Sequence, residues 1–413
     1  MRRIVAPALV VALLFAGIGC AKGVQVARKL EAVFSWQYPN NEDEIILHLL
    51  PEHYYRYRHH FESCRPFIKS GHLSDCLDIY SYLYTSEELA LLLESIRGER
   101  AATGLGAQVI ADDRGGFFVL RVLYDSPAYE AGIEEGSRIV GLVENKEKIL
   151  FKGTSEEAKK FSESGTVLNL LIVKEGETSP LTVSVKLGGY EVPVVDYYPV
   201  LTEGGLAYIR INNWIDRDAS ALGSTQSGLK DAADALLSQG PKMVVFDTRN
   251  PGGSLEAVLE VLTLFESDED APLVTLRREG RQTLVRSRGA VEHSLPPVFA
   301  NIPCAVVVDS ETASSSEIFA QYLKYKGCHV VSAHRSTRGK GTVQNIFPLP
   351  EGGGIQITAY EYFVSRDEYK MHGVGVTPTM RMRVPGEGIR SRATDGEYLR
   401  HALRVLVEHG LGQ

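Results

Sequence analysis

The arrangement of apolar and polar positions changes twice along the chain and divides it into three regions. Residues 24–100 look helical and carry no catalytic pattern. Residues 103–192 contain five short apolar runs, and a run of this kind is typical of a strand. The runs are "GLGAQVIA", "GFFVLRVL", "SRIVGLV", "VLNLLIV" and "LTVSVKL". Because only "SPAYEAGIEEGS" between them indicates a short helix and a glycine turn, the region is predicted to be a small β-rich domain.

A third pattern covers residues 201–384, where near-continuous apolar strands alternate with amphipathic helices. Strands such as "KMVVFDTR" and "CAVVVD" predict a largely parallel α/β core. Functional loops of such a core lie at the C-terminal ends of its strands. The segments "RNPGGS" and "SETASSSE" both follow strands in this way. The amphipathic stretch "TDGEYLRHALRVLVEHG" is expected to form a closing helix that Gly410 stops.

The first 20 residues have the pattern of a signal peptide. Arg2 and Arg3 precede an apolar run that is too short for a comfortable membrane span. The run ends at Cys20, whose position after Gly-Ile-Gly resembles a bacterial lipobox, although Gly17 stands where such boxes usually have leucine. A lipoprotein anchored at Cys20 and a plain secreted form both stay open. Either form is exported, to the periplasm or cell envelope.

Composition and charge indicate which ligands and partners the protein is expected to lack. The chain of 413 residues has a formal net charge of −8 and no dense Lys/Arg block, so the electrostatic signature of nucleic-acid binding is missing. No Cys/His spacing resembles a metal site, and no cofactor is expected. Beyond Cys20, four cysteines remain in a compartment expected to be oxidising. Plausible pairs are Cys64 with Cys76 and Cys304 with Cys328, with buried free thiols as the alternative for the second pair.

Three serines in "ETASSSEIFA" (311–320) stand between a predicted strand and a predicted helix. Serine is a favoured helix N-cap, so capping alone could explain the cluster. A hydroxyl at a helix N-terminus could also be a nucleophile, since the free N–H groups there stabilise negative charge. The serines alone do not decide between these two interpretations.

Two further loops supply the groups that a nucleophile would need. Lys340 lies between glycines in "RSTRGKGTVQN", and because Gly341 follows it, the loop does not fit a nucleotide-binding motif that needs Ser or Thr there. The glycines instead allow close backbone approach. In "DTRNPGGS", Gly252 and Gly253 offer unshielded N–H groups. A hydroxyl, an amine and paired N–H donors together indicate an acyl-transfer site.

The order of these motifs resembles that of the C-terminal processing peptidases, the S41 serine peptidases with a Ser-Lys dyad. The matching segments are "DIYSYLYTSEEL", "GLGA", "SPAYEAGI", "LAYIRI", "DTRNPGG", "TASSSEIFA", "GKGTVQ" and "HGVGVTP". The resemblance implies an α/β peptidase core of the crotonase/ClpP-like type over residues 195–413. It also implies an N-terminal helical domain (24–100) and an inserted PDZ domain (103–192).

Within the PDZ-like region, "GLGA" resembles the loop that binds a peptide's terminal carboxylate. Successive backbone N–H groups in such a loop form a nest for the carboxylate, and the next strand pairs with the peptide. The residues implied here are Gly104, Leu105, Gly106 and Ala107.

Within the core, the resemblance implies a role for three side chains. The family nucleophile, three places before the glutamate of Ser-x-Ser-Glu, falls on Ser314. The family's lysine base falls on Lys340, and the glutamine that orients it falls on Gln344.

The oxyanion would be held by the N–H of Ser315 and that of Gly252 or Gly253. This sequence has one residue fewer than the family between the arginine and asparagine of "DTRNPGG", which leaves the choice of glycine open. Ser315 and Ser316 are expected to be the helix caps.

The implied function is that of an exported serine endopeptidase that trims or degrades envelope proteins. Its partners would be substrates held by their C-termini, and the resemblance also allows an envelope adaptor protein. One alternative is an inactive PDZ-containing protein that only binds peptides. Another is an enoyl-CoA-hydratase-like enzyme, which also uses paired backbone donors but would need an acidic base.

Overall fold

A computed structural model describes the fold for most of the chain after residue 41. The described residues are 42–56, 61–97, 102–112, 114–123, 126–163, 165–190, 192–197, 205–216, 223–279, 282–350, 352–384 and 395–409. The predicted signal peptide and Cys20 lie outside them. No helix in these ranges is both long and apolar enough to cross a bilayer. The contacts divide the chain into one unit of residues 1–99 with 194–379 and a second of residues 100–193 with 380–413.

The first unit begins with a mostly helical segment. Its elements are α3 (Glu42–His53), η1 (Phe61–Cys64), α4 (Arg65–Ser70), η2 (Leu73–Asp75), β1 (Tyr82–Tyr84) and α5 (Ser86–Arg97). Thr85 caps α5 through its hydroxyl, which accepts from the N–H of Glu88 at 3.2 Å, while the Glu88 carboxylate accepts from the N–H of Thr85 at 2.9 Å. This reciprocal pair satisfies two N–H groups at the helix start. The strand β1 is the exception to the helical expectation.

A parallel sheet forms the first half of the core. Strands β11 (Leu206–Ile211), β12 (Met243–Asp247), β15 (Cys304–Val307) and β16 (His329–Ser332) pair in that order, all parallel. The short β10 (Val195–Tyr197) pairs antiparallel with β11. The parallel strands are almost wholly buried and apolar, as their sequence pattern predicts.

A second, antiparallel sheet was not predicted from the sequence. Its centre is the long strand β18 (Gly354–Val364), which pairs with β1, β13, β17 and β19. Its other strands are β13 (Pro272–Arg278), β14 (Gln282–Ser287), β17 (Thr342–Pro348) and β19 (Tyr369–Lys370). The loop that carries Lys340 leads directly into β17.

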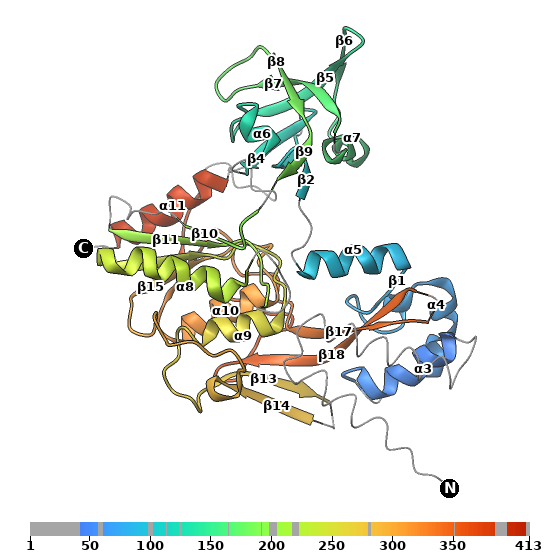
Figure 1. The fold of residues 1–413 in the computed structure, drawn as a ribbon, viewed down its shortest axis with the longest axis vertical. Coiled ribbons are helices and arrows are strands. Elements are labelled where there is room, and N and C mark those ends of the chain that lie inside the picture. The colour runs from blue at the N-terminus through green and yellow to red at the C-terminus, as the bar shows by residue number, and fades with distance from the viewer. Residues whose placement is uncertain are drawn as a thin grey trace. The chain divides into compact units, whose positions relative to one another are not determined.

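Helices pack between and around the two sheets (Figure 1). They are α8 (Thr225–Leu236), α9 (Leu255–Leu262) and α10 (Ser315–Tyr325), with single turns η4 (Leu237–Gln239) and η5 (Arg288–Ala290). Helix α10 contacts β15 and β16 of the parallel sheet and β18 of the antiparallel sheet, while α9 contacts α10 and β13. The serine helix is therefore held by both sheets.

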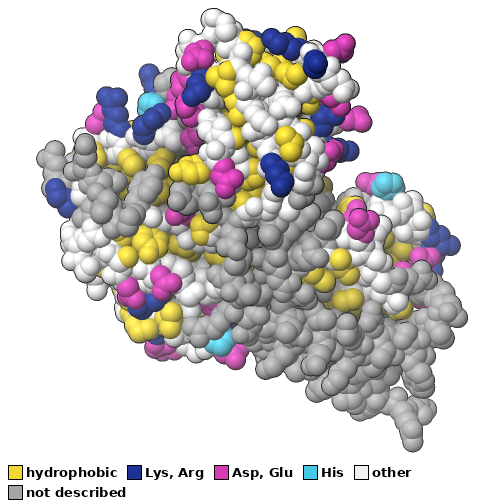
Figure 2. Space-filling model, turned by 45° about the horizontal axis from the view of Figure 1, so that its top comes forward, with side chains coloured by type: hydrophobic (Ala, Val, Ile, Leu, Met, Phe, Trp, Pro, Cys, Tyr) yellow, Lys and Arg dark blue, Asp and Glu magenta, His cyan; other side chains and the backbone are white. Residues whose placement is uncertain are grey.

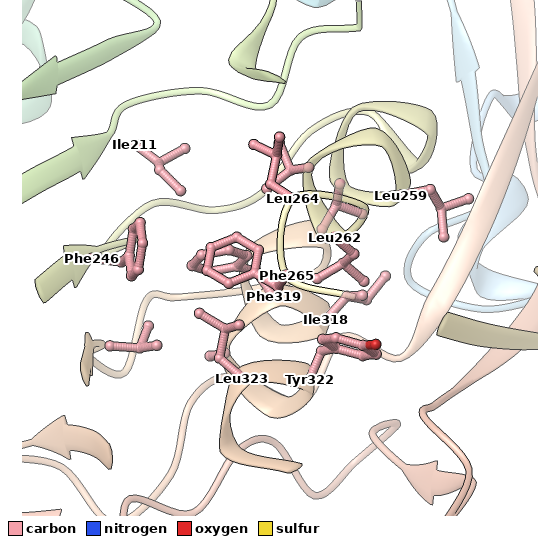
Figure 3. Packing of buried hydrophobic residues seen from close by; sticks show 14 of the residues in the cluster. Ile211, Phe246, Leu259, Leu262, Leu264, Phe265, Ile318, Phe319, Tyr322 and Leu323 are labelled. Atoms are coloured by element: carbon pink, nitrogen blue, oxygen red, sulfur yellow. The ribbon is translucent and has the colours of Figure 1, made fainter. Parts of the chain in front are cut away.

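An aromatic cluster that includes Phe319 of α10 packs this helix against its neighbours (Figure 3). The ring of Phe319 lies 5.6 Å from that of Phe246 and 5.5 Å from that of Phe265, measured between centroids. These three side chains are at most 2% exposed. Burial of one such side chain contributes roughly 1.5–3 kcal/mol, so the register of α10 against β12 and α9 is strongly determined.

Both plausible cysteine pairs form disulfides. Cys304 and Cys328 have their Cα atoms 4.8 Å apart and join the start of β15 to the residue before β16. Cys64 and Cys76 have their Cα atoms 5.4 Å apart and close a local loop in the N-terminal segment.

The second unit contains all five predicted strands, consecutive in one antiparallel sheet. The order is β3 (Ala107–Ala111), β4 (Phe117–Val122), β5 (Arg138–Glu144), β7 (Val167–Val173) and β8 (Leu181–Lys186). The remaining elements are β2 (Ala102–Gly104), α6 (Pro127–Glu130), β6 (Glu147–Leu150), α7 (Ser155–Lys159), η3 (Lys160–Ser162), β9 (Gly188–Tyr190), β20 (Met380–Arg381) and α11 (Asp395–Glu408).

Charges of both signs are interspersed on the described part of the face drawn in Figure 2. Pairs such as Lys230 with Asp234 and Arg404 with Glu408 bridge successive turns of a helix. Exposed pairs of this kind contribute at most about 1 kcal/mol, so the fold depends on its apolar core rather than on them.

Candidate active site

Ser314 occupies a strained turn between β15 and α10. Its φ is 56° and its ψ is −123°, a backbone conformation that residues other than glycine rarely adopt. Such a conformation costs on the order of 1–3 kcal/mol and persists only where the surroundings enforce it. The glycine loop packs closely against this turn, because a Cβ at Gly252 would lie only 2.7 Å from the Cβ of Ser314.

The expectation that Ser315 and Ser316 cap the helix is wrong, because Ser314 occupies the N-cap position. The hydroxyl of Ser315 instead lies 3.0 Å from the carbonyl oxygen of Gly253 and 3.1 Å from that of Ser254. It therefore ties the first turn of α10 to the glycine loop that follows β12.

Ser316 makes a second tie to the same loop. Its hydroxyl accepts from the indole N–H of Trp214 and donates to Oδ1 of Asn250, both at 2.7 Å. Oδ1 of Asn250 also accepts from the N–H of Gly252 at 2.9 Å, while Nδ2 donates to the carbonyl of Ile211 at 2.8 Å. The Asn250 amide thus joins β11, the glycine loop and α10.

These contacts distinguish Gly252 from Gly253, the two alternatives that the sequence left open as the oxyanion donor. The N–H of Gly252 already donates to Asn250. Among the described residues nothing accepts from the N–H of Gly253 or from that of Ser315. Ser315 is the first residue of α10, where a backbone N–H has no acceptor within the helix. The two available donors are therefore the N–H groups of Gly253 and Ser315.

The loop around Lys340 needs its glycines for close approach. Gly339 has a φ of +80°, and a Cβ there would lie 3.0 Å from the backbone nitrogens of two residues in the facing loop. A Cβ on Gly341 would lie 2.2 Å from the backbone nitrogen of His372. The expected close backbone approach is present at both positions.

One buried carboxylate joins the Lys340 loop to the Ser314 turn. Oε2 of Glu317 accepts from the N–H of Ser314 at 2.9 Å and from that of Lys340 at 2.8 Å. Oε1 accepts from the N–H of Gly339 at 2.6 Å and from the hydroxyl of Thr337. Glu317 is 0% exposed, so these four donors replace the water that its charge has lost.

Tyr362 adds a second link between the same two segments. Its hydroxyl lies 3.3 Å from the carbonyl oxygen of Ser314 and also donates to that of Lys340. Burial raises the pKa of Tyr362 well above its ordinary value, so the hydroxyl keeps its proton and remains a donor. A third link is the N–H of Arg338, which donates to the carbonyl of Thr312 at 3.1 Å.

The amine of Lys340 is in an environment that disfavours its charge. Burial lowers its pKa, with Arg338 adding to this shift and Glu317 opposing it. Nζ lies 5.4 Å from the ring centroid of Tyr80. No hydrogen bond joins this amine to the Ser314 hydroxyl in the present conformation, and nucleophile–base contacts in proteins without ligand often tighten only when substrate binds.

Gln344 lies on β17 without a hydrogen bond to Lys340. Its Nε2 donates to the hydroxyl of Thr342 at 2.9 Å and reaches that of Thr358 at 3.4 Å. The hydroxyl of Thr358 in turn donates to Asp78 at 3.0 Å. Gln344 is therefore connected to the N-terminal segment rather than to the lysine.

Several residues of this site were not singled out from the sequence. Glu317 could have been found, since it ends the Ser-x-Ser-Glu motif, but its spacing gives no sign of the Lys340 loop that it binds. Tyr362 lies on the unpredicted strand β18, and Tyr80 lies in a segment expected to be helical. Only the tertiary arrangement brings these side chains to the lysine.

The "GLGA" loop in the second unit has two glycines in left-handed conformations, Gly104 at φ 126° and Gly106 at φ 72°. The side chain of Leu105 is 2% exposed, and its N–H donates to the carbonyl of Phe161 at 2.7 Å. Of the loop's donors, the N–H of Gly106 has no acceptor among the described residues. Ala107, the first residue of β3, pairs with β4 on one side.

The chemistry of the core site is that of a hydroxyl, an amine and two backbone donors. In the part of the chain that the structure describes, no group of three or more His, Cys, Asp or Glu side chains could hold a metal ion.

Comparison with known proteins matches the core to a peptidase family. Residues 205–382 match the model of peptidase family S41. The carboxy-terminal processing protease CtpB of Bacillus subtilis is 26% identical over 319 residues, which are 76% of this chain and 61% of that protein. The carboxyl-terminal-processing protease of Picosynechococcus sp. is 30% identical over 291 residues, 69% of this chain and 65% of that protein.

A solved structure shares the fold. The photosystem II D1 C-terminal processing protease superposes with a TM-score of 0.52 at 20% identity, covering 88% of this chain and 96% of that one. At this identity the match concerns the fold alone. The chain spans roughly three-fifths to two-thirds of the length of the two relatives compared above.

Proposed function

The chain belongs to peptidase family S41 through residues 205–382, and on that premise we propose that it is a serine endopeptidase that cleaves proteins near their C-termini. One observation carries the proposal. The carboxylate of Glu317 accepts from the N–H of Ser314 and from that of Lys340, so a hydroxyl and an amine extend from two turns that share one anchor.

In the proposed reaction, the oxygen of Ser314 attacks the peptide carbonyl while the neutral amine of Lys340 takes its proton. The N–H groups of Ser315 and Gly253 hold the resulting oxyanion. The Lys340 ammonium then gives that proton to the departing amine, which leaves an acyl-enzyme on Ser314. Water hydrolyses the ester in the second half, again with Lys340 as base.

The position of Ser314 supports this assignment over its two neighbours. The hydroxyls of Ser315 and Ser316 already bind Gly253 and Asn250. Ser314 is partly exposed on a strained turn at the N-terminus of an 11-residue helix, whose dipole favours negative charge nearby. Strain of this kind is concentrated at functional sites.

We further propose that residues 103–192 are a PDZ domain and that the core over 195–413 is of the crotonase/ClpP-like type. Strand β3 is an edge strand of its sheet among the described residues, so a peptide strand could pair with it. The amide of Gly106 beside it could bind a terminal carboxylate. Because the N–H of Leu105 is engaged by Phe161, it would contribute only after a local change.

Export is part of the proposal, with residues 1–20 as signal peptide and Cys20 as the residue that lipid would modify. Two disulfides, Cys64–Cys76 and Cys304–Cys328, support an oxidising compartment such as the periplasm or cell envelope. An adaptor protein of the envelope would be a further partner. Metabolic labelling of wild-type and Cys20→Ser cells with radioactive palmitate distinguishes the lipidated from the secreted form.

The competing proposal is a peptide-binding protein without catalysis. It is favoured by the missing hydrogen bond between the hydroxyl of Ser314 and the amine of Lys340. The first experiment below separates the two.

Replacing Ser314 with alanine should abolish cleavage of an unfolded model protein, because only the attacking oxygen is lost. Ser310→Ala, an exposed change in the same loop, should cleave at the wild-type rate. Turnover is followed by gel and mass spectrometry, and thermal melts check folding. Undiminished cleavage by Ser314→Ala would place the nucleophile elsewhere, and a wild-type protein that binds but never cleaves would favour the competing proposal.

Lys340→Arg should be as inactive as Lys340→Ala although it preserves charge, because arginine does not lose its proton in this pH range. In the wild type the neutral amine is the active form. Since burial lowers the lysine pKa, kcat/KM should rise with pH along a limb on the acid side of lysine's ordinary range. An active arginine variant, or a limb that begins only in the ordinary lysine range, would exclude Lys340 as the base.

Cleavage should favour peptides with a free, apolar C-terminus over the same peptides with an amidated end. The proposed nest around Gly106 recognises a carboxylate by its charge and geometry. Initial rates on matched free-acid and amidated peptides measure the preference. Equal rates for both would contradict carboxylate recognition without affecting the assignment of Ser314.

A further inference from the structure

A tight turn in the N-terminal segment brings an aromatic ring to the amine of Lys340. Ile79 and Tyr80 form the middle of this turn, which the N–H of Ser81 closes by donating to the carbonyl of Asp78 at 3.0 Å. The ring centroid of Tyr80 lies 5.4 Å from Nζ of Lys340. The segment that carries Tyr80 precedes residues 100–193 of the second unit in the sequence, whereas Lys340 follows them.

The turn is held firmly against the antiparallel sheet. The carboxylate of Asp78 accepts from the N–H of Tyr80 at 2.8 Å, from the hydroxyl of Ser81 at 3.1 Å and from that of Thr358 at 3.0 Å. Nε2 of Gln356 donates to the carbonyl of Tyr80 at 2.7 Å. Both Thr358 and Gln356 lie on β18. The position of the ring is therefore fixed by the same strand that carries Tyr362.

The ring, rather than the hydroxyl, makes the contacts that Tyr80 has near the site. Its second aromatic neighbour is His372, whose ring centroid lies 6.5 Å away in an edge-on arrangement. No described residue forms a hydrogen bond with the Tyr80 hydroxyl. The ring is thus near both the amine of Lys340 and His372, the residue whose backbone packs against Gly341.

We propose that Tyr80 is a positioning residue for the base of the proposed peptidase: its ring covers the amine of Lys340, excludes water from it and restricts where it can lie. The inference rests on the proposed function for the role of Lys340. It adds that the segment before the second unit contributes directly to the catalytic site of the core.

The ring has two opposing effects on the pKa of Lys340. A ring face attracts an ammonium, which favours the charged lysine. Exclusion of water disfavours the charged lysine and lowers its pKa. The charged groups acting on this amine are Glu317, which raises its pKa, and Arg338, which lowers it, while Tyr362 and His372 lie on the adjoining segments. Because burial is the largest cause of the lowered pKa, removing the ring should favour the ammonium.

The test uses the full chain with Tyr80→Leu and Tyr80→Met, which remove the ring by two different apolar replacements. Tyr80→Phe keeps the ring and removes the hydroxyl. Tyr82→Leu is the matched control, because Tyr82 is a partly exposed tyrosine of the same segment that packs on Tyr84 rather than on Lys340. Far-UV circular dichroism and thermal melts confirm that each variant is folded.

Two measurements allow a failure of this inference to be distinguished from a failure of the proposed function. The first is the pH profile of kcat/KM on a model peptide. The second is the rate at which trace acetic anhydride acetylates Lys340 as a function of pH, measured by mass spectrometry in a Ser314→Ala background. Acetylation reports the neutral amine directly and needs no proteolysis.

We expect Tyr80→Leu and Tyr80→Met to lose about tenfold in kcat/KM at neutral pH and to recover it as the pH is raised, with acetylation of Lys340 shifted in the same direction. Tyr80→Phe and Tyr82→Leu should match the wild type in both readouts. An acetylation profile that is unchanged, or shifted to lower pH, in the folded variants that lack the ring would overturn the inference. If the wild type shows no Ser314-dependent cleavage, the proposed function fails, and acetylation alone still decides whether Tyr80 shields the lysine.

Discussion

The buried carboxylate of Glu317 is the interaction on which the geometry of the site depends. A charge that is fully removed from water is tolerated only where hydrogen-bond donors replace its hydration. Three backbone N–H groups and one hydroxyl do so here, and each bond to a charged group contributes roughly 1.5–3 kcal/mol. Because those donors come from both the Ser314 turn and the Lys340 loop, the charge cannot be satisfied unless the two segments meet.

The two sheets make this meeting possible. The Ser314 turn follows β15 of the parallel sheet, and the Lys340 loop precedes β17 of the antiparallel sheet. Helix α10 contacts both sheets, and the Phe319 cluster fixes it at its first turns. The disulfide between Cys304 and Cys328 fastens the opposite end of the same β–α unit. The nucleophile assigned to Ser314 is thus supported from rigid elements rather than from a free loop.

The sequence was most informative where a residue pattern has one structural meaning. Apolar runs such as "KMVVFDTR" are hard to place anywhere except in a buried parallel strand, and the parallel core is confirmed. The five strands of the second unit are confirmed for the same reason. The antiparallel sheet was missed, although "GIQITAYEYFV" alternates polar and apolar residues over part of its length. Two partners of its central strand, β1 and β13, are distant in the sequence and leave no local signal, although β17 and β19 directly adjoin it.

The site could be predicted only in part. The serine cluster, the glycines around Lys340 and the Pro-Gly-Gly turn were recognisable because each restricts the backbone or supplies a reactive group. The different roles of the three adjacent serines could not be predicted, because they depend on which hydroxyl contacts Asn250 and which contacts Gly253. Likewise, only the contact of Asn250 with Gly252 distinguishes the two glycine donors.

The most direct test of the account is the exchange of backbone amides in the variant Glu317→Gln, followed by mass spectrometry. Each oxygen of the Glu317 carboxylate accepts from two donors. In either orientation of the glutamine amide, its NH₂ group replaces one of these oxygens, so two donors lose their acceptor. We predict that peptides covering Gly339 and Lys340 exchange at least about tenfold faster, and that a fluorophosphonate no longer labels Ser314. Glu311→Gln, at an exposed position of the same loop, should behave as wild type in both respects. Unchanged protection together with wild-type labelling in Glu317→Gln would contradict the claim that this carboxylate holds the site together.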